Sequence, residues 1–451
     1  MFVIQPFSPL IKSLLQGDTY SFRTDVRYRP LSYVICLYAS PFYLLFNLLT
    51  KEFIALSSNE YNEYLKLTPG ETTQYLIRHL FLVEDSTVDY KIAKTLRDIV
   101  VKSKVANWDG NMTSFHIFTT TSCNVKCPYC FEKNVPLQHM VEKTAKDVAN
   151  YIIENNNKQR VLIRWFGGEP LLNIKATDVI TSILKTKHFE YDSIIFTNGL
   201  LFTPELILKA KSLWHLHTAQ ITIDGPEKVF NEIKRGSSFT NAYQTVLGNI
   251  SLLINSGIRV TIRTHITETN VSELDALLLD LASQFAGSPL FSIYIHRLFD
   301  EQRNKTINND FTTLEKNIFD INKKIDSLFP LSFHEHLRKD IRSHHCFGDS
   351  PWSISILPDG SFIPCTHYDR TTTTYGNIYE KQSMKPLGWF EYLPPQKECL
   401  SCFYYPDCYQ LTECPEAPPF CNDWRKQMRL ERIHKQMLND WTCFANKFGL
   451  I

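Results

Sequence analysis

Residues 114–130 read SFHIFTTTSCNVKCPYC, a short apolar segment followed by three closely spaced cysteines. Residues 115–118 form a short apolar segment of the kind that strands favour. Cys123, Cys127 and Cys130 follow in one short loop. Three thiolates can hold three irons of a [4Fe–4S] cluster, which normally needs four cysteines, and the fourth iron is then free for a substrate. Structural zinc is the alternative, but it usually takes four ligands in paired Cys-x-x-Cys units, which this spacing lacks.

Short apolar segments alternate with longer helical ones after this loop. The predicted strands are residues 115–118, 160–166, 193–197, 219–223, 259–265 and 290–296. Helices are predicted over residues 142–155, 176–185 and 243–255. Repeated strand–helix units of this length indicate a parallel sheet. We therefore predict an α/β fold, a partial (β/α)6 TIM-like barrel, with its chemistry at the carboxyl ends of the strands.

Three domains are expected along the chain. Residues 1–108 form a small α/β domain of winged-helix type, with a strand and then a helix in residues 52–64, and helices over residues 74–82 and 90–101. Residues 109–335 form the core barrel. Residues 336–451 are rich in cysteine, proline and tyrosine and end in a polar helix over residues 424–439. Such a segment builds little core by apolar packing, so bound metal would supply stability.

The composition is that of a soluble globular protein. Of 451 residues, 43% are hydrophobic and 21% charged, and 48 basic residues face 47 acidic ones. A net charge of +1 gives no electrostatic case for a nucleic acid partner. The longest uncharged run, residues 33–49, is interrupted by Pro41, and no secretory signal is visible, so no membrane association and a cytoplasmic location are expected. In such a chain the 12 cysteines favour metal ligation over disulfides.

A second motif, WFGGEP, covers residues 165–170 at the end of the second predicted strand. Its glycines, Gly167 and Gly168, would let the backbone approach a ligand closely. Glu169 could then accept hydrogen bonds from an ammonium group.

The three-then-two cysteine spacing, with Tyr129 before the last cysteine, resembles the signature of the radical S-adenosylmethionine (SAM) superfamily. The resemblance implies a SAM-binding [4Fe–4S] cluster on the three cysteines, and Glu169 as the partner of the SAM amine. Further predicted SAM contacts lie at later strand ends, where Arg263 would pair with the SAM carboxylate. The cofactor-binding residues implied are Tyr129, Gly167, Gly168, Glu169, Asn198, Thr222, Asp224 and Arg263.

A second cysteine group lies near the end of the chain and resembles the SPASM extension, which binds auxiliary iron–sulfur clusters. The resemblance implies one [4Fe–4S] cluster on Cys399, Cys402, Cys408 and Cys421, and a second on Cys346, Cys365 and Cys414. The fourth position of the second cluster would be open or filled by His344 or His345. A zinc ribbon is the alternative for this region. Cys36 and Cys443 are interpreted as ordinary buried thiols.

The resemblance covers roughly residues 112–425 and implies the activity. A radical SAM oxidoreductase takes one electron from a reductant such as flavodoxin or ferredoxin, cleaves SAM to a 5′-deoxyadenosyl radical, and abstracts hydrogen from its substrate. The preferred substrate is a ribosomally made precursor peptide that receives a thioether, C–C or C–O crosslink. Residues 1–108 would then recognise the leader, or else brace the barrel. An anaerobic sulfatase-maturing enzyme, which forms formylglycine, is one alternative, and a non-catalytic iron–sulfur or zinc scaffold protein is another. No catalytic residue is assigned.

Overall fold

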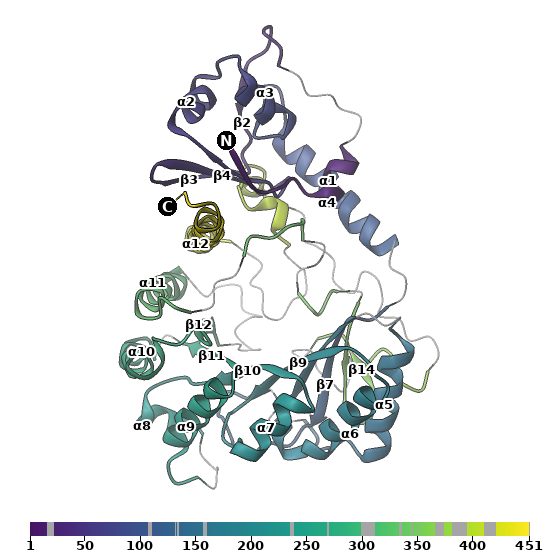
Figure 1. Cartoon of the computed structure of the whole chain (residues 1–451). Helices are drawn as coiled ribbons and strands as arrows, with labels where there is room; N and C mark the ends of the chain where they lie inside the picture. The colour runs from purple at the N-terminus through teal and green to yellow at the C-terminus, as the bar shows by residue number, and fades with distance from the viewer. Residues whose placement is uncertain are drawn as a thin grey trace.

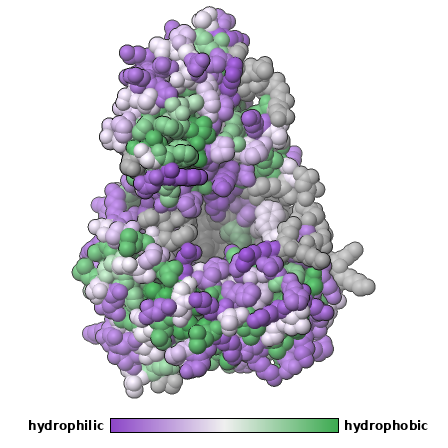
Figure 2. Space-filling model, viewed as in Figure 1, coloured by the Kyte–Doolittle hydropathy of each residue, from purple (hydrophilic) through white to green (hydrophobic). Residues whose placement is uncertain are grey.

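The computed structural model describes most of the chain, and the described residues are 1–15, 22–106, 111–130, 132, 135–156, 160–234, 239–267, 270–298, 312–332, 336–342, 344, 346–350, 352–365, 374–380, 395–409 and 421–450. Figure 1 shows two bodies, a larger α/β body below and a smaller one above, where the N-terminal domain and the last helix lie together. Figure 2 shows that the same face is hollowed between the two bodies.

Six parallel strands form the sheet of the larger body, in the order in which they occur in the sequence. They are β7 (Ser114–Thr120), β8 (Val161–Gly167), β9 (Tyr191–Thr197), β10 (Leu216–Thr222), β11 (Arg259–Ile266) and β12 (Phe291–Arg297). The connecting helices are η1 (Pro170–Asn173), α5 (Glu142–Glu154), α6 (Ile174–Thr186), α7 (Pro204–Ser212), α8 (Glu227–Ile233), α9 (Ala242–Asn255) and α10 (Val271–Phe285), and α11 (Thr312–Leu328) follows β12. The predicted partial barrel is confirmed.

Strand β11 illustrates why the sheet takes this form. Val260, Ile262 and Ile266 are fully buried in the main core, which the helices share. The alternate residues Arg263 and His265 are polar and lie on the opposite face. Alternation of this kind leaves one apolar face for helices and a polar face for the inside of the curved sheet.

The sheet continues beyond β7, which the sequence did not predict. Strand β13 (Ser353–Ile356) pairs in parallel with β7, and β14 (Phe362–Ile363) pairs antiparallel with β13. The C-terminal region therefore adds a hairpin to the barrel sheet instead of forming a separate layer.

The N-terminal domain contains a four-stranded antiparallel sheet in the order β1–β5–β4–β3. Its strands are β1 (Phe2–Gln5), β3 (Val34–Ala39), β4 (Phe42–Asn47) and β5 (Phe53–Leu56), and a separate ladder joins β2 (Tyr28–Pro30) to β6 (Leu82–Glu84). The helices are α1 (Pro9–Leu14), α2 (Ser58–Lys66), α3 (Glu71–Arg78) and α4 (Asp89–Ala106). Helix α2 is capped by Ser57, which forms a capping box with Glu60.

The last helix, α12 (Asp423–Phe448), packs on the N-terminal domain (Figure 1). Ring centroids of Trp441 and Phe42 lie 5.1 Å apart, and Met437 is fully buried in the same core. That core also takes in Tyr405, which lies in the short helix η3 (Tyr405–Asp407), close after η2 (Lys397–Cys399). Although α12 is long, no described helix is both long and apolar enough to cross a membrane.

Candidate cofactor site

The carboxyl ends of the barrel strands bring most of the predicted site residues to one edge. Thr120 on β7 is paired with Gly167 on β8, and Thr197 on β9 with Ile221 on β10. Thr222 is paired with Arg263 across β10 and β11. The cysteine loop follows β7 directly, so it lies at this edge, where parallel-barrel enzymes hold their active sites.

The two glycines of the WFGGEP motif bring the end of β8 against the cysteine loop. A Cβ on Gly167, whose φ is +131°, would lie 2.0 Å from the Thr120 carbonyl oxygen, and one on Gly168 would lie 2.5 Å from that of Ser122. The Glu169 N–H donates to the Ser122 carbonyl at 2.8 Å. Both glycines are therefore required by packing within the chain, because no larger residue fits against the backbone that leads into the cysteines.

The Glu169 carboxylate is fully buried and joins β8 to β9. It accepts hydrogen bonds from the Leu171 N–H at 3.1 Å, the Thr197 hydroxyl at 2.8 Å and the Asn198 N–H at 2.8 Å. Burial raises the pKa of Glu169 to about 7, against the effect of these bonds. A carboxylate offers about four acceptor positions, so three donors leave capacity for one more.

Asn198 connects this carboxylate to the cysteine loop. Its side-chain N–H donates to the Asn124 side-chain oxygen at 2.8 Å and lies 3.9 Å from the Cys123 Sγ atom. Its side-chain oxygen accepts from the Leu200 N–H at 3.0 Å. Asn198 therefore contacts the cysteine loop at its first cysteine, and its predicted contact with SAM stays a prediction.

Tyr129 and Asp224, both predicted cofactor contacts, bind each other. The Tyr129 hydroxyl donates to one carboxylate oxygen of Asp224, and the other accepts from the His265 N–H at 2.8 Å and contacts its Nδ1 at 3.0 Å. Burial would raise the pKa of Asp224, but His265 and Lys234 hold it below its ordinary value. The pair fixes the ring between Cys127 and Cys130 to the end of β10.

Lys234 is a site residue that the sequence analysis missed. It is only 4% exposed, and its Nζ lies 3.6 Å from the Cys127 Sγ atom. Burial would lower the pKa of Lys234, but Cys127 and Asp224 raise it above the ordinary value. Arg263 contacts the His296 Nδ1 at 3.0 Å, and its pairing with the SAM carboxylate stays a prediction. Lys234 directly follows α8, four residues after the buried Phe230, and this spacing was the available signal, but a lysine at the end of such a short helix usually faces solvent.

The donor set fits a [4Fe–4S] cluster together with SAM. Cys123, Cys127 and Cys130 form no disulfide. Across the described ranges no three His, Cys, Asp or Glu side chains are close enough to hold a single metal ion. A cluster differs because each thiolate binds a different iron. Three free thiols, a buried ammonium beside one of them and a carboxylate with an open acceptor position match such a group.

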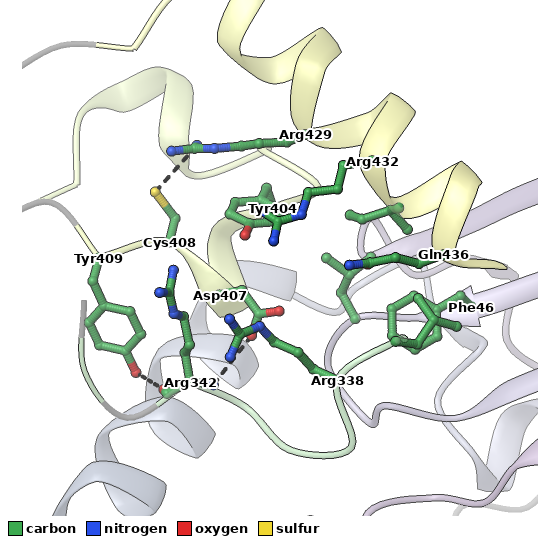
Figure 3. A pocket seen from close by; sticks show the side chains of 13 residues that line it. Phe46, Arg338, Arg342, Tyr404, Asp407, Cys408, Tyr409, Arg429, Arg432 and Gln436 are labelled. Carbon is green, nitrogen blue, oxygen red and sulfur yellow. Dashed lines mark hydrogen bonds between the residues drawn. The ribbon is translucent and has the colours of Figure 1, made fainter. Parts of the chain in front are cut away.

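The four cysteines of the first predicted auxiliary cluster, Cys399, Cys402, Cys408 and Cys421, lie in the smaller body near α12. Arg429 on α12 donates to the Cys408 Sγ at 3.6 Å and to the Cys421 Sγ at 4.0 Å, so these two predicted ligands share one guanidinium. Figure 3 shows Arg429 reaching Cys408 across the ring of Tyr404, which lies 4.6 Å from the guanidinium carbon. Cys402 lies near the same two sulfurs. Burial raises the pKa of the Cys402 thiol most, and Cys408 and Cys421 raise it further. The N–H of Cys402 donates to the Cys399 carbonyl at 3.2 Å.

The other predicted auxiliary ligands lie beside the barrel. Cys346 and Cys365 flank the β13–β14 hairpin, and the Cys346 Sγ accepts from the Gly348 N–H at 3.2 Å. His344 packs against Trp352, with ring centroids 5.2 Å apart. Cys414 and His345 lie outside the described residues. Cys36 and Cys443, interpreted as buried thiols, are both exposed, so that interpretation was wrong.

A partial parallel barrel with a three-cysteine loop at its carboxyl edge defines a class of iron–sulfur enzymes. Residues 117–281 match the family model of the radical SAM superfamily. The chain therefore contains a radical SAM domain over residues 117–281, and the interpretation as a non-catalytic scaffold is set aside. Its class implies a [4Fe–4S] cluster and SAM as cofactors.

Two curated relatives share part of the sequence. The chain is 26% identical to an uncharacterized protein of Methanocaldococcus jannaschii over 275 residues, which are 59% of this chain and 88% of that protein. It is 25% identical to the serine-type anaerobic sulfatase-maturating enzyme of Bacteroides thetaiotaomicron over 147 residues, which are 30% of this chain and 35% of that enzyme.

Two solved structures share the fold. Native anSMEcpe with bound AdoMet and the Kp18Cys peptide aligns with a TM-score of 0.55 at 15% identity, over 74% of this chain and 99% of that chain. Streptococcus suis SuiB bound to the precursor peptide SuiA aligns with a TM-score of 0.51 at 15% identity, over 88% of this chain and 99% of that chain.

Proposed function

We propose that this chain is a peptide maturase that binds two auxiliary [4Fe–4S] clusters and crosslinks a ribosomally made precursor peptide. The observation that carries the proposal is the second body above the barrel, in which the N-terminal domain, the Cys399–Cys408 loop and α12 share one core. SAM cleavage alone needs only the barrel. A cysteine-bearing body that faces it across a hollow suits a long, flexible substrate (Figure 2), and SuiB, whose likeness extends over 88% of this chain, was solved with a precursor peptide.

At the barrel edge, Glu169 and Lys234 would hold the two ends of the SAM amino acid group. The open acceptor position on Glu169 would take the ammonium, and the Lys234 Nζ would pair with the carboxylate. Arg263 is the weaker candidate for the carboxylate, because its guanidinium is engaged with His296. When bound, the cluster and SAM supply the radical that abstracts hydrogen, and the protein supplies position and water exclusion.

In the second body, Cys399, Cys402, Cys408 and Cys421 would ligate one auxiliary cluster. Arg429 would offset the negative charge of their thiolates, because its guanidinium reaches two of the four sulfurs. The second auxiliary cluster is proposed on Cys346, Cys365 and Cys414.

The leader of the precursor would add to the N-terminal sheet as an extra strand. Strand β3 lies at one edge of that sheet and pairs only with β4 among the described strands. Tyr38 on β3 is 56% exposed. An exposed edge of this kind offers unpaired backbone groups to an extended peptide.

Anaerobic sulfatase maturation is the second candidate, supported by the relative from Bacteroides thetaiotaomicron. It leaves the N-terminal domain unexplained, because that match covers only 30% of this chain. The two candidates differ in their products, since formylglycine is an aldehyde and a crosslink is not.

The test is anaerobic reconstitution with the short peptides encoded beside the gene. We expect about twelve irons per chain, 5′-deoxyadenosine formation after reduction, and a crosslinked peptide by tandem mass spectrometry. An aldehyde captured by a hydrazide on a sulfatase-derived peptide would favour the second candidate. About four irons, together with zinc, would leave the radical core and remove the auxiliary clusters.

A further inference from the structure

A fully buried ion pair joins the N-terminal domain to the proposed auxiliary site. The Lys51 Nζ lies 2.7 Å from a carboxylate oxygen of Asp407, and their side chains are 0% and 6% exposed. Burial lowers the pKa of Lys51, and Asp407 opposes that effect. A buried charge that loses its partner is strongly unfavourable, so the structure depends on the pair staying together.

The turn that carries Lys51 is held rigidly. Lys51 lies between β4 and β5 with a φ of 63°, in the left-handed region. The Asn47 side-chain oxygen accepts from the N–H groups of Leu49 at 2.9 Å and Thr50 at 3.2 Å, and its amide donates to the Leu80 carbonyl at 2.8 Å. The ammonium is therefore presented from a fixed backbone.

Asp407 stands directly before Cys408, in the loop that starts at Cys402. A second cation of the N-terminal domain holds the same loop: Arg97 on α4 donates to the Cys408 carbonyl at 2.7 Å. Its guanidinium also lies over the rings of Tyr405 and Tyr409, on both sides of Asp407. The N-terminal domain thus contacts the loop at two separate points, Asp407 and the Cys408 carbonyl, and Cys408 is a proposed cluster ligand.

We propose that the N-terminal domain is a structural component of the auxiliary cluster site, and that Lys51 is a positioning residue that fixes the Cys402–Cys408 loop through Asp407. The inference rests on the proposed function, because it needs the cluster on Cys399, Cys402, Cys408 and Cys421. It assigns residues 1–108 a role in cluster assembly that is independent of any leader peptide.

The test compares Lys51→Met with the control His79→Phe. His79 contacts the carboxylate of Glu52, which is 1% exposed, at 2.7 Å, so the control removes a partner from an equally buried carboxylate in the same turn without touching the cysteine loop. Both are made in full-length protein and in a Cys123→Ala, Cys127→Ala, Cys130→Ala background, where electron paramagnetic resonance reports the auxiliary clusters alone. We expect Lys51→Met to lose about four irons and the signal of one cluster, and His79→Phe to retain both.

Three results would overturn the inference. Full iron content with an unchanged spectrum and midpoint potential in Lys51→Met would show that the pair does not position the loop. Equal losses in both variants would reduce the effect to stability of the domain. About four irons in the wild type would remove the auxiliary clusters and the inference together, and this result is distinguishable because it appears without any substitution.

The double variant Lys51→Met, Asp407→Leu covers the case in which the single variant does not fold. Removing both charges of a buried pair is often tolerated where removing one is not. A folded double variant with a lost or shifted auxiliary signal supports the positioning role. A wild-type iron content and spectrum in that variant would contradict it.

Discussion

Replacing Glu169 by Gln tests whether the buried carboxylate binds SAM or only ties strand ends together. Gln keeps the shape and one acceptor oxygen, but it puts an NH2 group where the second oxygen stood. In the structure each of the two carboxylate oxygens faces at least one N–H donor, namely Leu171 at 3.1 Å or Asn198 at 2.8 Å. One of these donors must then lose its acceptor, whichever way the amide turns.

Two free energies follow from this geometry. The unsatisfied buried N–H costs about 1–3 kcal/mol of folding stability whether or not SAM is present. If SAM occupies the remaining acceptor position, its charge-assisted bond becomes a neutral one, which costs about 1–3 kcal/mol of binding, or about 5- to 150-fold in Kd. Thermal unfolding measures the first loss and anaerobic SAM titration measures the second.

The pH dependence separates the two roles. Burial raises the pKa of Glu169 to about 7, so the neutral acid predominates in the folded protein below that pH. In the apo protein, the stability that this raised pKa contributes is fully present below about pH 4.5 and is lost as the pH rises through 7. The charged group that acts on this carboxyl is Lys234, which lowers the pKa of Glu169 against the effect of burial. SAM affinity of the wild type should rise between pH 6 and pH 8, roughly as one proton is released, and Glu169→Gln should remove that rise. Equal affinity and equal pH profiles in the two proteins would refute the reasoning and leave the motif as a structural turn.

Three further outcomes are expected. Changing Cys123, Cys127 and Cys130 together to Ala should abolish 5′-deoxyadenosine formation and remove about four irons, and unchanged cleavage would contradict the cluster assignment. Lys234→Met should weaken SAM binding about 5- to 150-fold and more than Arg263→Met does, and the reverse order in a titration would return the carboxylate to Arg263. Labelling the exposed Cys36 with a maleimide at alkaline pH, in a Cys443→Ser background, should slow peptide modification but not SAM cleavage. The matched control labels Cys443 in Cys36→Ser, and equal effects of both labels would argue against leader binding at β3.

The barrel was predictable because apolar residues recur about every second position in its strands and about every 3.6 positions in its helices. Along β11 the apolar residues alternate, as in Val260 and Ile262, and this pattern is visible without any structure. Strand β13 was missed because its four residues, SISI, are too few to show a period and pair with a strand over two hundred residues earlier. Short strands of this kind are defined by their partner and not by their own sequence.

The site divides in the same way. Cysteines are rare and chemically distinct, so their spacing identified the loop at Cys123–Cys130. Lys234 and Lys51 were missed because a buried lysine is decided by what folds over it, and the sequence shows two ordinary basic residues. The motif glycines also have a role that the sequence did not predict, since Gly168 packs against the Ser122 carbonyl, and their approach to a ligand stays a prediction.

Removal of residues 1–108 would separate leader binding from bracing only if that domain were independent of the rest. Met437 and Trp441 on α12 are buried against it, so the deletion would expose an apolar helix face. Loss of clusters after truncation would then follow from either role. Point substitutions avoid this problem, because Cys36 lies on the sheet edge that would receive a leader, whereas Lys51 holds the cysteine loop. Leader binding and loop positioning use different surfaces of one domain, so both can be true. Labelling of Cys36 tests the first and the Lys51→Met variant tests the second.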